Sequence, residues 1–535
     1  MTPFADLLEG LLYAPARNAK LALLKDHFAR EPDPERGWAL AALTGGLELK
    51  SAKPALLRAL IAERMDAELF ALSYDYVGDL AETIALVWPE RPGANRAPEL
   101  SAVIEALDGA TRAQASALIE GWLDAMTGTE RWALLKLVTG GLRVGVSERL
   151  AKQALADFGG QDVTALEELW HGLTPPFEDL FAWLEGRAEK PVSAARAPFR
   201  PVMLAQPLVK KADRADPEAV DPDLIRPEAY AAEWKWDGVR VQATQDGGVR
   251  RLYTRTGEDI SAAFPDLIAA LDLEATLDGE LLVMREGEVA PFSDLQHRLN
   301  RKTVSKKLLD THPAHLRAYD ALVVGAEDWR GRPFRDRRAG LEALIESGRD
   351  RLDLSPLVSF DSLDGLDRLR AEPPHRCIEG VMLKRWDSVY EPGRPKGPWF
   401  KWKRDPYVVD AVILYAQRGH GKRSSYYSDY TFGVWDGDAL TPVGKFYFGF
   451  TDEELKRLDA YVRDNTVERF GPVRAVRAEP DHGLVVEVAF EGLNRSPRHK
   501  SGLAMRFPRL NRLRWDKPAR EADTLGRLQG LLPPL

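Results

Sequence analysis

The change of residue periodicity along the chain is the feature that most constrains its fold. Residues 1 to about 190 are rich in Ala and Leu, and apolar residues recur at helical spacing, as between Trp132 and Leu150. From residue 206 onward, short β-like runs are separated by turns that contain glycine. A chain of 535 residues is also too long for a single hydrophobic core. The sequence therefore predicts a multidomain protein with helical, mixed and β-rich parts in that order.

The predicted domain boundaries follow this change. A linker at about 187–205, which contains three prolines, separates a helical domain at 1–190 from an α+β domain at 200–404. Within the α+β domain, strands are expected at 251–255, 275–284, 316–324 and 377–384, and helices at 261–272 and 336–347. Strands expected at 408–414, 430–435 and 484–490 predict a small β-barrel at 405–535.

The composition excludes several classes of protein. Hydrophobic residues make up 44% and charged residues 29% of the chain, as in an ordinary globular protein. The single cysteine, Cys377, excludes a disulfide framework and a cysteine-based zinc site. The first residues lack the basic and apolar regions of a secretory signal, and no run of 18 apolar residues occurs. We therefore expect a cytoplasmic protein that does not enter the membrane.

The charges are distributed unevenly along the chain. The net charge is −8, yet residues 1–190 hold 19 basic against 29 acidic residues, whereas residues 494–535 hold 10 basic against 3 acidic ones. A basic cluster can bind an anionic partner whatever the total charge is. The net charge therefore does not exclude nucleic acid as a partner.

The segment Glu233-Trp-Lys-Trp-Asp-Gly-Val-Arg240 contains a candidate catalytic lysine, Lys235. As a strand that enters an Asp-Gly turn, it would place Glu233 and Lys235 on one face and the two tryptophans on the other. Apolar surroundings and the charge of Arg240 are expected to lower the pKa of Lys235, which would make its amine a nucleophile. The alternative is an ordinary surface hairpin with an amphipathic lysine.

A glycine-rich segment in the helical domain predicts an anion contact. Gly140-Gly-Leu-Arg-Val-Gly145 precedes Ser147, a plausible N-cap for the next helix. Glycines would allow backbone amides to approach an anion at that helix start. The alternative is a plain connection between two helices.

Five further elements carry groups suited to phosphate chemistry. They offer an arginine after a strand, two carboxylates on one strand face, an aromatic ring that could stack on a base, a carboxylate on a buried strand, and two lysines on one strand face. A buried carboxylate requires a metal or a cation beside it. The residues are Arg255, Asp278 with Glu280, Tyr319, Glu379, and Lys401 with Lys403. Each alone could be a capped turn, a core aromatic or a surface ion pair.

Taken in order, these motifs resemble those of the covalent nucleotidyltransferases, which include DNA ligases, RNA ligases and mRNA capping enzymes. The matching stretches are K-W-D-G-V-R, T-R-T-G, L-D-G-E-L, A-Y-D, E-G-V-M-L-K and W-F-K-W-K. The segment from Ser501 to Lys517, with its R-F-P-R, is similar to the terminal motif of ATP-dependent DNA ligases. G-G-L-R-V-G-V-S and P-F-R-P-V-M-L-A resemble that family's helical DNA-binding domain and the start of its catalytic domain. The resemblance covers nearly the whole chain.

The resemblance implies a fold and an activity. The expected domains are a helical DNA-binding domain, a nucleotidyltransferase (ATP-grasp-like) domain and an OB-fold domain. Lys235 would attack ATP to form lysyl-AMP, AMP would pass to the 5′-phosphate of nicked double-stranded DNA, and the 3′-hydroxyl would then displace AMP. The expected cofactors are ATP and Mg²⁺ or Mn²⁺. The family also implies a monomer that acts on the nucleoid in DNA repair, replication and recombination.

The resemblance also assigns roles to single residues. Glu233 would lie by adenine and Tyr319 would stack on it, while Arg240 and Arg255 would contact the nucleotide or the nick phosphate. Glu280 would contact the ribose or a metal, and Glu379 would bind the metal. Lys401, Lys403 and Arg394 would surround the α-phosphate, although Pro395 stands where a second basic residue is frequent. Arg514 and Lys517 would orient pyrophosphate once the barrel closes over the site.

Other functions fit the sequence less well. RNA ligases and capping enzymes share the catalytic core, but they do not account for the helical domain or the R-F-P-R segment. An NAD⁺-dependent ligase would bring a four-cysteine zinc module, which one cysteine cannot build. A non-catalytic DNA-binding scaffold would not need all of the motif residues. The segment 419–424 resembles a phosphate-binding loop, but its spacing fails the G-x-x-x-x-G-K-[ST] pattern.

Overall fold

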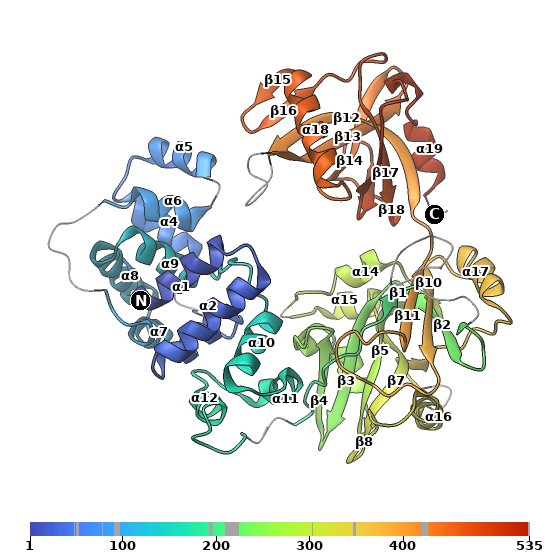
Figure 1. Ribbon diagram of the computed structural model, residues 1–535, viewed down its shortest axis with the longest axis horizontal. Helices are drawn as coiled ribbons and strands as arrows, with labels where there is room; N and C mark the ends of the chain where they lie inside the picture. Colours follow the sequence, from blue (N-terminus) through green and yellow to red (C-terminus); the bar gives the residue numbers. More distant parts are fainter. Residues whose placement is uncertain are drawn as a thin grey trace. The chain divides into compact units, whose positions relative to one another are not determined.

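The computed structural model describes residues 1–47, 49, 53–77, 79–89, 97–191, 196–208, 224–301, 303–345, 349–418 and 426–532 (Figure 1). Two segments lie outside these residues: 192–195, which is part of the expected linker, and 419–424, which was compared above with a phosphate-binding loop. Over the ranges that are described, every helix is too short or too polar to span a membrane.

The N-terminal region is helical, as predicted. Its helices are α1 (Thr2–Tyr13), α2 (Arg17–Arg30), α3 (Glu35–Leu43), α4 (Pro54–Ala62), α5 (Ala67–Val77), α6 (Leu80–Val87), α7 (Leu100–Asp108), α8 (Arg112–Ala125), α9 (Gly128–Thr139), α10 (Glu148–Gly159), α11 (Val163–Leu169), η1 (Trp170–Gly172) and α12 (Glu178–Leu184). The predicted N-cap is confirmed, because the Ser147 hydroxyl accepts a hydrogen bond from the Leu150 N–H at 3.2 Å. Leucines and alanines of these helices form one continuous core.

The chain forms two compact units, and it passes between them several times. Unit 1 comprises Met1–Gln206, Gly238–Ser355 and Trp386–Pro398. Unit 2 comprises Pro207–Asp237, Pro356–Arg385 and Trp399–Leu535. One of the crossings separates Asp237 from Gly238, inside the segment that carries Lys235.

Unit 1 contains a seven-stranded, mainly antiparallel sheet with the order β4-β3-β5-β7-β8, to which β6 and β9 add at β5 and β7. Its strands are β3 (Val239–Asp246), β4 (Val249–Thr254), β5 (Ala275–Arg285), β6 (Glu288–Val289), β7 (Ala314–Val324), β8 (Glu327–Asp328) and β9 (Leu352–Leu354). The accompanying helices are η4 (Ser261–Ala263), α13 (Pro265–Ala270), α14 (Phe292–Gln296), α15 (Lys306–Thr311) and α16 (Phe334–Leu344). Leu277 and Leu281 face the core of this sheet.

One predicted helix differs in detail. The expected helix at 261–272 is a 3₁₀ turn at Ser261–Ala263 followed by a short helix, α13, that begins at Pro265. Proline lacks the N–H that would continue the earlier turn, but it fits the first position of a new helix. The proline therefore divides the predicted helix in two.

Within unit 1, the helical region contacts the region of the seven-stranded sheet. The guanidinium of Arg330 lies 2.7 Å from the carboxylate of Glu168 on α11. The ring of His171 packs against Tyr253 and Phe199, with centroid distances of 4.9 and 5.6 Å. An ion pair and an aromatic cluster thus join these two parts of the unit.

Unit 2 contains a four-stranded sheet and a β-rich C-terminal region. The sheet has the order β1-β11-β10-β2, with β1 (Gln206–Pro207), β2 (Tyr230–Trp236), β10 (Ile378–Arg385) and β11 (Trp399–Lys403), and helix α17 (Leu363–Ala371) contacts β10. The aromatic and aliphatic side chains of one sheet face form a core with α17, including Trp234, Val381 and Phe400. The opposite face carries the charged residues described below.

The C-terminal region confirms the predicted OB-type β domain. A seven-stranded sheet runs β14-β13-β12-β16-β15, and β17 joins β12 to β20. The elements are β12 (Tyr407–Arg418), β13 (Tyr427–Asp436), β14 (Ala439–Phe446), α18 (Asp452–Asp464), β15 (Thr466–Phe470), β16 (Val473–Val476), β17 (Val485–Phe490), β18 (Gly492–Arg495), β19 (Leu503–Arg506), β20 (Arg509–Arg514), η6 (Ala519–Glu521) and α19 (Leu525–Gly530). β18 and β19 form a separate hairpin-like pair.

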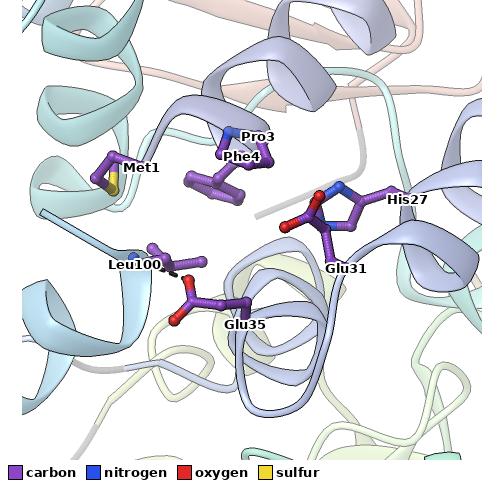
Figure 2. Close-up of a pocket in the computed structure, with 7 residues that line it drawn as sticks. All are labelled: Met1, Pro3, Phe4, His27, Glu31, Glu35 and Leu100. Atoms are coloured by element: carbon purple, nitrogen blue, oxygen red, sulfur yellow. Dashed lines mark hydrogen bonds between the residues drawn. The ribbon is translucent and has the colours of Figure 1, made fainter. Parts of the chain in front are cut away.

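A small pocket in the helical region contains a buried histidine (Figure 2). His27 is 8% exposed, and its Nε2 has no hydrogen-bond partner among the described residues. Burial lowers the pKa of His27 to about 4. Glu35, which also lines the pocket, accepts hydrogen bonds from Leu100 and Ser101 and so caps α7. The polar groups of this pocket therefore serve the helical fold.

The histidine makes stability depend on pH. Between pH 6.5 and 4 the unfolded chain protonates His27 and the folded chain does not, so stability falls as the pH falls. From pH 7 to pH 4 the wild type should lose about 3 kcal/mol more than His27→Gln does. Urea unfolding at each pH measures this difference, and exposed His482→Gln is the control. Parallel losses in the wild type and His27→Gln would contradict the prediction.

Candidate active site

Most of the charged site residues that the sequence predicts, and that belong to unit 2, lie on one face of the sheet formed by β2, β10 and β11. In the antiparallel register, Lys235 lies opposite Gly380, and Gly380 lies opposite Lys403. Met382 in turn lies opposite both Glu233 and Lys401. Directly opposed residues project from the same face of a sheet. The structure therefore confirms that Glu233 and Lys235 share a face, and it places both predicted lysines of β11 on that face.

A bulge in β10 brings Glu379 to the same face. The register shifts between Ile378, which pairs with Trp236, and Gly380, which pairs with Lys235, so Glu379 is the extra residue. Its carboxylate lies 2.9 Å from the Lys235 ammonium. A Cβ at Gly380 would stand 2.2 Å from the Trp402 carbonyl oxygen, so only glycine permits this close approach of β11.

Glu379 is the centre of a group of cations. Besides Lys235, the Lys403 ammonium lies 3.6 Å and the Arg506 guanidinium 3.8 Å from its oxygens. Burial alone would raise the pKa of Glu379, but the charges of Lys235 and Lys403 lower it to about 2. Glu379 is therefore a carboxylate at every physiological pH, and it pairs with these three cations.

Asp237, two residues after Lys235, adds a second carboxyl group. Its Oδ2 accepts a hydrogen bond from Arg506, whereas its buried Oδ1 has no partner among the described residues. Burial raises the pKa of Asp237 despite the Arg506 hydrogen bond, and the charge of Glu379 acts in the same direction. Asp237 and Glu379 thus form a carboxyl pair beside the lysine.

Glu233 and Lys384 form a separate buried ion pair. Their charged atoms are 2.5 Å apart, and each side chain is only 2% exposed. The Lys384 ammonium also lies 4.9 Å from the centroid of the Trp399 ring. Since a buried charge without a partner is very costly, each residue of this pair requires the other.

The other predicted nucleotide contacts lie on the seven-stranded sheet of unit 1. Arg240 on β3 pairs with Glu280 on β5 in the strand register, and its guanidinium makes two hydrogen bonds to the fully buried Asp278. The Tyr319 hydroxyl donates to Asp278 at 3.1 Å, and the Arg240 guanidinium lies 5.9 Å from the centroid of the Tyr319 ring. This sheet therefore brings together three of the predicted residues, Arg240, Glu280 and Tyr319.

Four predicted residues lie elsewhere. Arg255 and Arg394 are exposed on unit 1. On the barrel, Lys517 and Arg514 both contact Asp410 on β12, at 2.7 and 3.3 Å. Arg514 and Lys517 thus share Asp410 as their partner in the β-rich region.

Three residues of these clusters were missed by sequence reasoning. Lys384 ends the E-G-V-M-L-K motif, and Arg506 opens R-F-P-R, so both stood in motifs without an assigned role. Tyr390, which contacts Asp278 and Arg240, lies in a segment that offered no such indication. The hydrogen-bond partners of Tyr390 and Arg506 are 112 to 269 residues away in the chain. Lys384 and Glu233 meet because their strands, β10 and β2, are paired.

The carboxyl groups beside Lys235 are candidate metal ligands. Within the ranges that are described, no cluster of three or more histidine, cysteine, aspartate or glutamate side chains could hold a metal ion. Mg²⁺, however, is commonly held by one or two carboxylates together with substrate phosphates and water. The Asp237–Glu379 pair, with its unpartnered buried Oδ1, supplies such oxygen donors. This donor set fits a hard divalent cation that shares its ligands with a phosphate.

Comparison with protein families accounts for most of the chain. Residues 3–156 match the family model described as "DNA ligase N terminus", residues 203–403 match "ATP dependent DNA ligase domain", and residues 423–517 match "ATP dependent DNA ligase C terminal region". The three matches follow the order that the sequence predicts.

Individual relatives match over long stretches. A "Probable DNA ligase" of Koribacter versatilis is 35% identical over 442 residues, which cover 77% of this chain and 74% of the relative. "DNA ligase 1" of Korarchaeum cryptofilum is 30% identical over 98% of this chain and 97% of its own length. A "Probable DNA ligase" of Anaeromyxobacter sp. (strain K) is 31% identical over 99% of both chains.

A solved structure supports the fold over nearly the whole chain. The protein named "Pmar-Lig_PreS3" covers 96% of this chain and 99% of its own, with a TM-score of 0.59 and 16% identity. The family models, the curated relatives and this shared fold agree with the order of motifs. The chain therefore belongs to the family of ATP-dependent DNA ligases, the enzymes that seal nicks in DNA.

Proposed function

We propose that Lys235 is the nucleophile through which this ligase seals nicks in double-stranded DNA. The Lys235 ammonium first loses a proton to water, and the resulting amine attacks the α-phosphorus of ATP. A phosphoramide bond forms as a second N–H proton leaves, and the bond to pyrophosphate breaks. The 5′-phosphate at the nick then takes AMP from the lysine, and the 3′-hydroxyl attacks that phosphate and releases AMP. The observation that carries the proposal is the position of Lys235 on one sheet face with Lys401, Lys403 and the Glu379 carboxylate.

The charged face suits a reaction in which phosphate changes partners. Lys401 and Lys403 supply positive charge for the α-phosphate from positions fixed by the strand register. Such a transfer relies mainly on alignment and charge neutralisation. Glu379 pairs with the Lys235 ammonium before the reaction, at a distance of 2.9 Å. We infer that this pair holds the lysine in place until ATP arrives.

The remaining nucleotide contacts follow from the same proposal. Glu233, in its ion pair with Lys384, lies by adenine, and Tyr319 stacks on the base. Arg240 and Arg255 contact the phosphate of the nucleotide or of the nick, and Glu280 contacts the ribose or a metal. Arg394, exposed and followed by proline, serves the α-phosphate. Arg514 and Lys517 orient the leaving pyrophosphate.

The proposed enzyme has three domains and a nucleic-acid substrate. Residues 1–190 grip DNA around the nick, residues 200–404 carry out nucleotidyl transfer, and residues 405–535 form the OB-fold domain. In the first of these, Arg143 is exposed in the turn before α10, where it can meet a phosphate whatever the base sequence is. We propose that the enzyme acts as a monomer on the nucleoid in the cytoplasm, in DNA repair, replication and recombination.

The first experiment tests the nucleophile. Lys235→Ala should abolish formation of the lysyl-AMP adduct, because alanine has no amine to carry the phosphoramide. Mass spectrometry of the protein incubated with ATP measures the adduct, and sealing of nicked DNA is followed in parallel. Lys445→Ala, which removes an exposed lysine of β14, is the matched control and should keep both activities. An adduct on another lysine of Lys235→Ala, formed at the wild-type rate, would refute the assignment.

A second experiment tests the metal. We propose that Glu379 holds Mg²⁺ or Mn²⁺ together with phosphate oxygens, and that Glu280 contacts the ribose or a metal. The cation, when bound, offsets the charge of the triphosphate. Excess EDTA should therefore stop lysyl-AMP formation, and EDTA already saturated with Mg²⁺ should not. Glu379→Gln should lose sealing far more than it loses affinity for nicked DNA in a gel-shift assay. Full activity of the wild type in excess EDTA would exclude the metal.

A third experiment tests in which step of the reaction the barrel residue Lys517 acts. If Lys517 orients pyrophosphate, it matters only while pyrophosphate leaves. Lys517→Ala should slow lysyl-AMP formation by a few orders of magnitude, a loss of roughly 3–4 kcal/mol of transition-state stabilisation. The same variant should seal pre-adenylated nicked DNA at close to the wild-type rate. Lys500→Ala, an exposed lysine near the same end of the chain, is the control. A defect confined to the pre-adenylated nick would show that Lys517 serves another step.

A further inference from the structure

The carboxylate of Asp278 is the centre of a buried hydrogen-bonded cluster in unit 1. Its oxygens accept four hydrogen bonds: from Nε and Nη2 of Arg240 at 3.0 and 2.6 Å, from the Tyr319 hydroxyl at 3.1 Å and from the Tyr390 hydroxyl at 2.6 Å. We call Arg240, Asp278, Tyr319 and Tyr390 the Asp278 cluster. Four donors satisfy a carboxylate that is fully buried, so removal of one donor leaves an oxygen short of a partner.

The Tyr390 hydroxyl makes hydrogen bonds to both members of the ion pair. It donates to Asp278 and accepts a hydrogen bond from Nη2 of Arg240 at 3.1 Å. A hydroxyl can do both at once, since it has one hydrogen and two lone pairs. Arg240 in addition donates through Nη1 to the Met203 carbonyl at 2.6 Å. The phenol therefore helps to set the direction in which this guanidinium points.

The surrounding chain holds Tyr390 in place. Its N–H donates to the Arg330 carbonyl at 2.8 Å, and its ring lies 5.7 Å from the Arg337 guanidinium. Arg337 is itself fixed by a fully buried ion pair with Asp320 and by a hydrogen bond to the Ser388 carbonyl at 3.1 Å. Tyr390 is only 4% exposed. The hydroxyl cannot leave Asp278 without disturbing this packing.

The hydroxyl also keeps its proton. Burial, together with the charge of Asp278, raises the pKa of Tyr390 well above its ordinary value. Although burial opposes its charge, Asp278 raises the pKa of Arg240 well above the ordinary value. Tyr390 and Arg240 therefore keep their protons, and so their roles as donors, at any pH at which the enzyme works.

We propose that Tyr390 is a positioning residue for nucleotidyl transfer, whose hydroxyl holds the Arg240–Asp278 pair in the orientation by which Arg240 meets a phosphate. The inference rests on the phosphate contact proposed above for Arg240. Tyr390 acts through Arg240 and touches no substrate itself. Its loss should therefore slow the reaction without a comparable change in the affinity for ATP.

The test compares three variants of the full-length protein in each step of the reaction. Lysyl-AMP formation at a range of ATP concentrations, transfer of AMP to the nick, and sealing of pre-adenylated DNA are measured in single turnovers. Arg240→Lys identifies the step that depends on the guanidinium. Tyr390→Phe should slow that same step about tenfold, because it removes hydrogen bonds to two charged groups, while the KM for ATP stays within about twofold.

The double variant distinguishes positioning from a general loss of stability. If Tyr390 acts through Arg240, Arg240→Lys with Tyr390→Phe should be no slower than Arg240→Lys alone. Tyr430→Phe is the matched control, since it removes the hydrogen bond of another buried phenol, to the Tyr427 carbonyl, and should leave every step unchanged. Thermal unfolding of each variant sets a temperature at which all of them are folded, and the rates are compared there.

The outcomes separate the two proposals. If Arg240→Lys leaves every step at the wild-type rate, the phosphate role of Arg240 is wrong, and the inference about Tyr390 falls with it. If Arg240→Lys slows a step that Tyr390→Phe leaves unchanged, or if the two losses multiply in the double variant, the inference about Tyr390 alone is overturned.

Discussion

The carboxylate of Glu379 is the interaction on which the charged face of unit 2 depends. Lys235, Lys403 and Arg506 all lie within 4 Å of it, and three cations so close together would repel one another without a negative charge between them. The carboxylate reaches them only because β10 has a bulge at this residue. A strand irregularity of one residue thus places a carboxylate beside Lys235.

Buried ion pairs of fixed geometry recur through the catalytic region. Glu233 with Lys384, Arg240 with Asp278 and Arg337 with Asp320 are each nearly or fully enclosed. Desolvation cancels much of the attraction in such pairs, so they add little net stability. They do fix orientation, because breaking one leaves an uncompensated charge. In a reaction that depends on alignment, this rigidity is the useful property.

The fold was largely predictable, and the site was predictable in part. Helical spacing and alternation identified the helical region and most strands, because these patterns are local. The expected helix at 261–272 failed at Pro265, where a single residue overrides the periodicity. Alternation also placed Lys235 with Glu233, and Lys401 with Lys403. It could not place Glu379, since a bulge reverses the face that alternation assigns.

The sequence by itself determined the family and the order of the domains, and it indicated Lys235 as the candidate nucleophile, because each is written in short motifs whose chemistry is local. Only the tertiary structure decided the partners: Lys384 for Glu233, Arg506 for Asp237, and Tyr390 for Asp278 and Arg240. The physical reason is that a buried charge takes whichever opposite charge or donor folding brings within hydrogen-bonding distance. That choice depends on strand register and on segments more than a hundred residues apart, which no local pattern encodes.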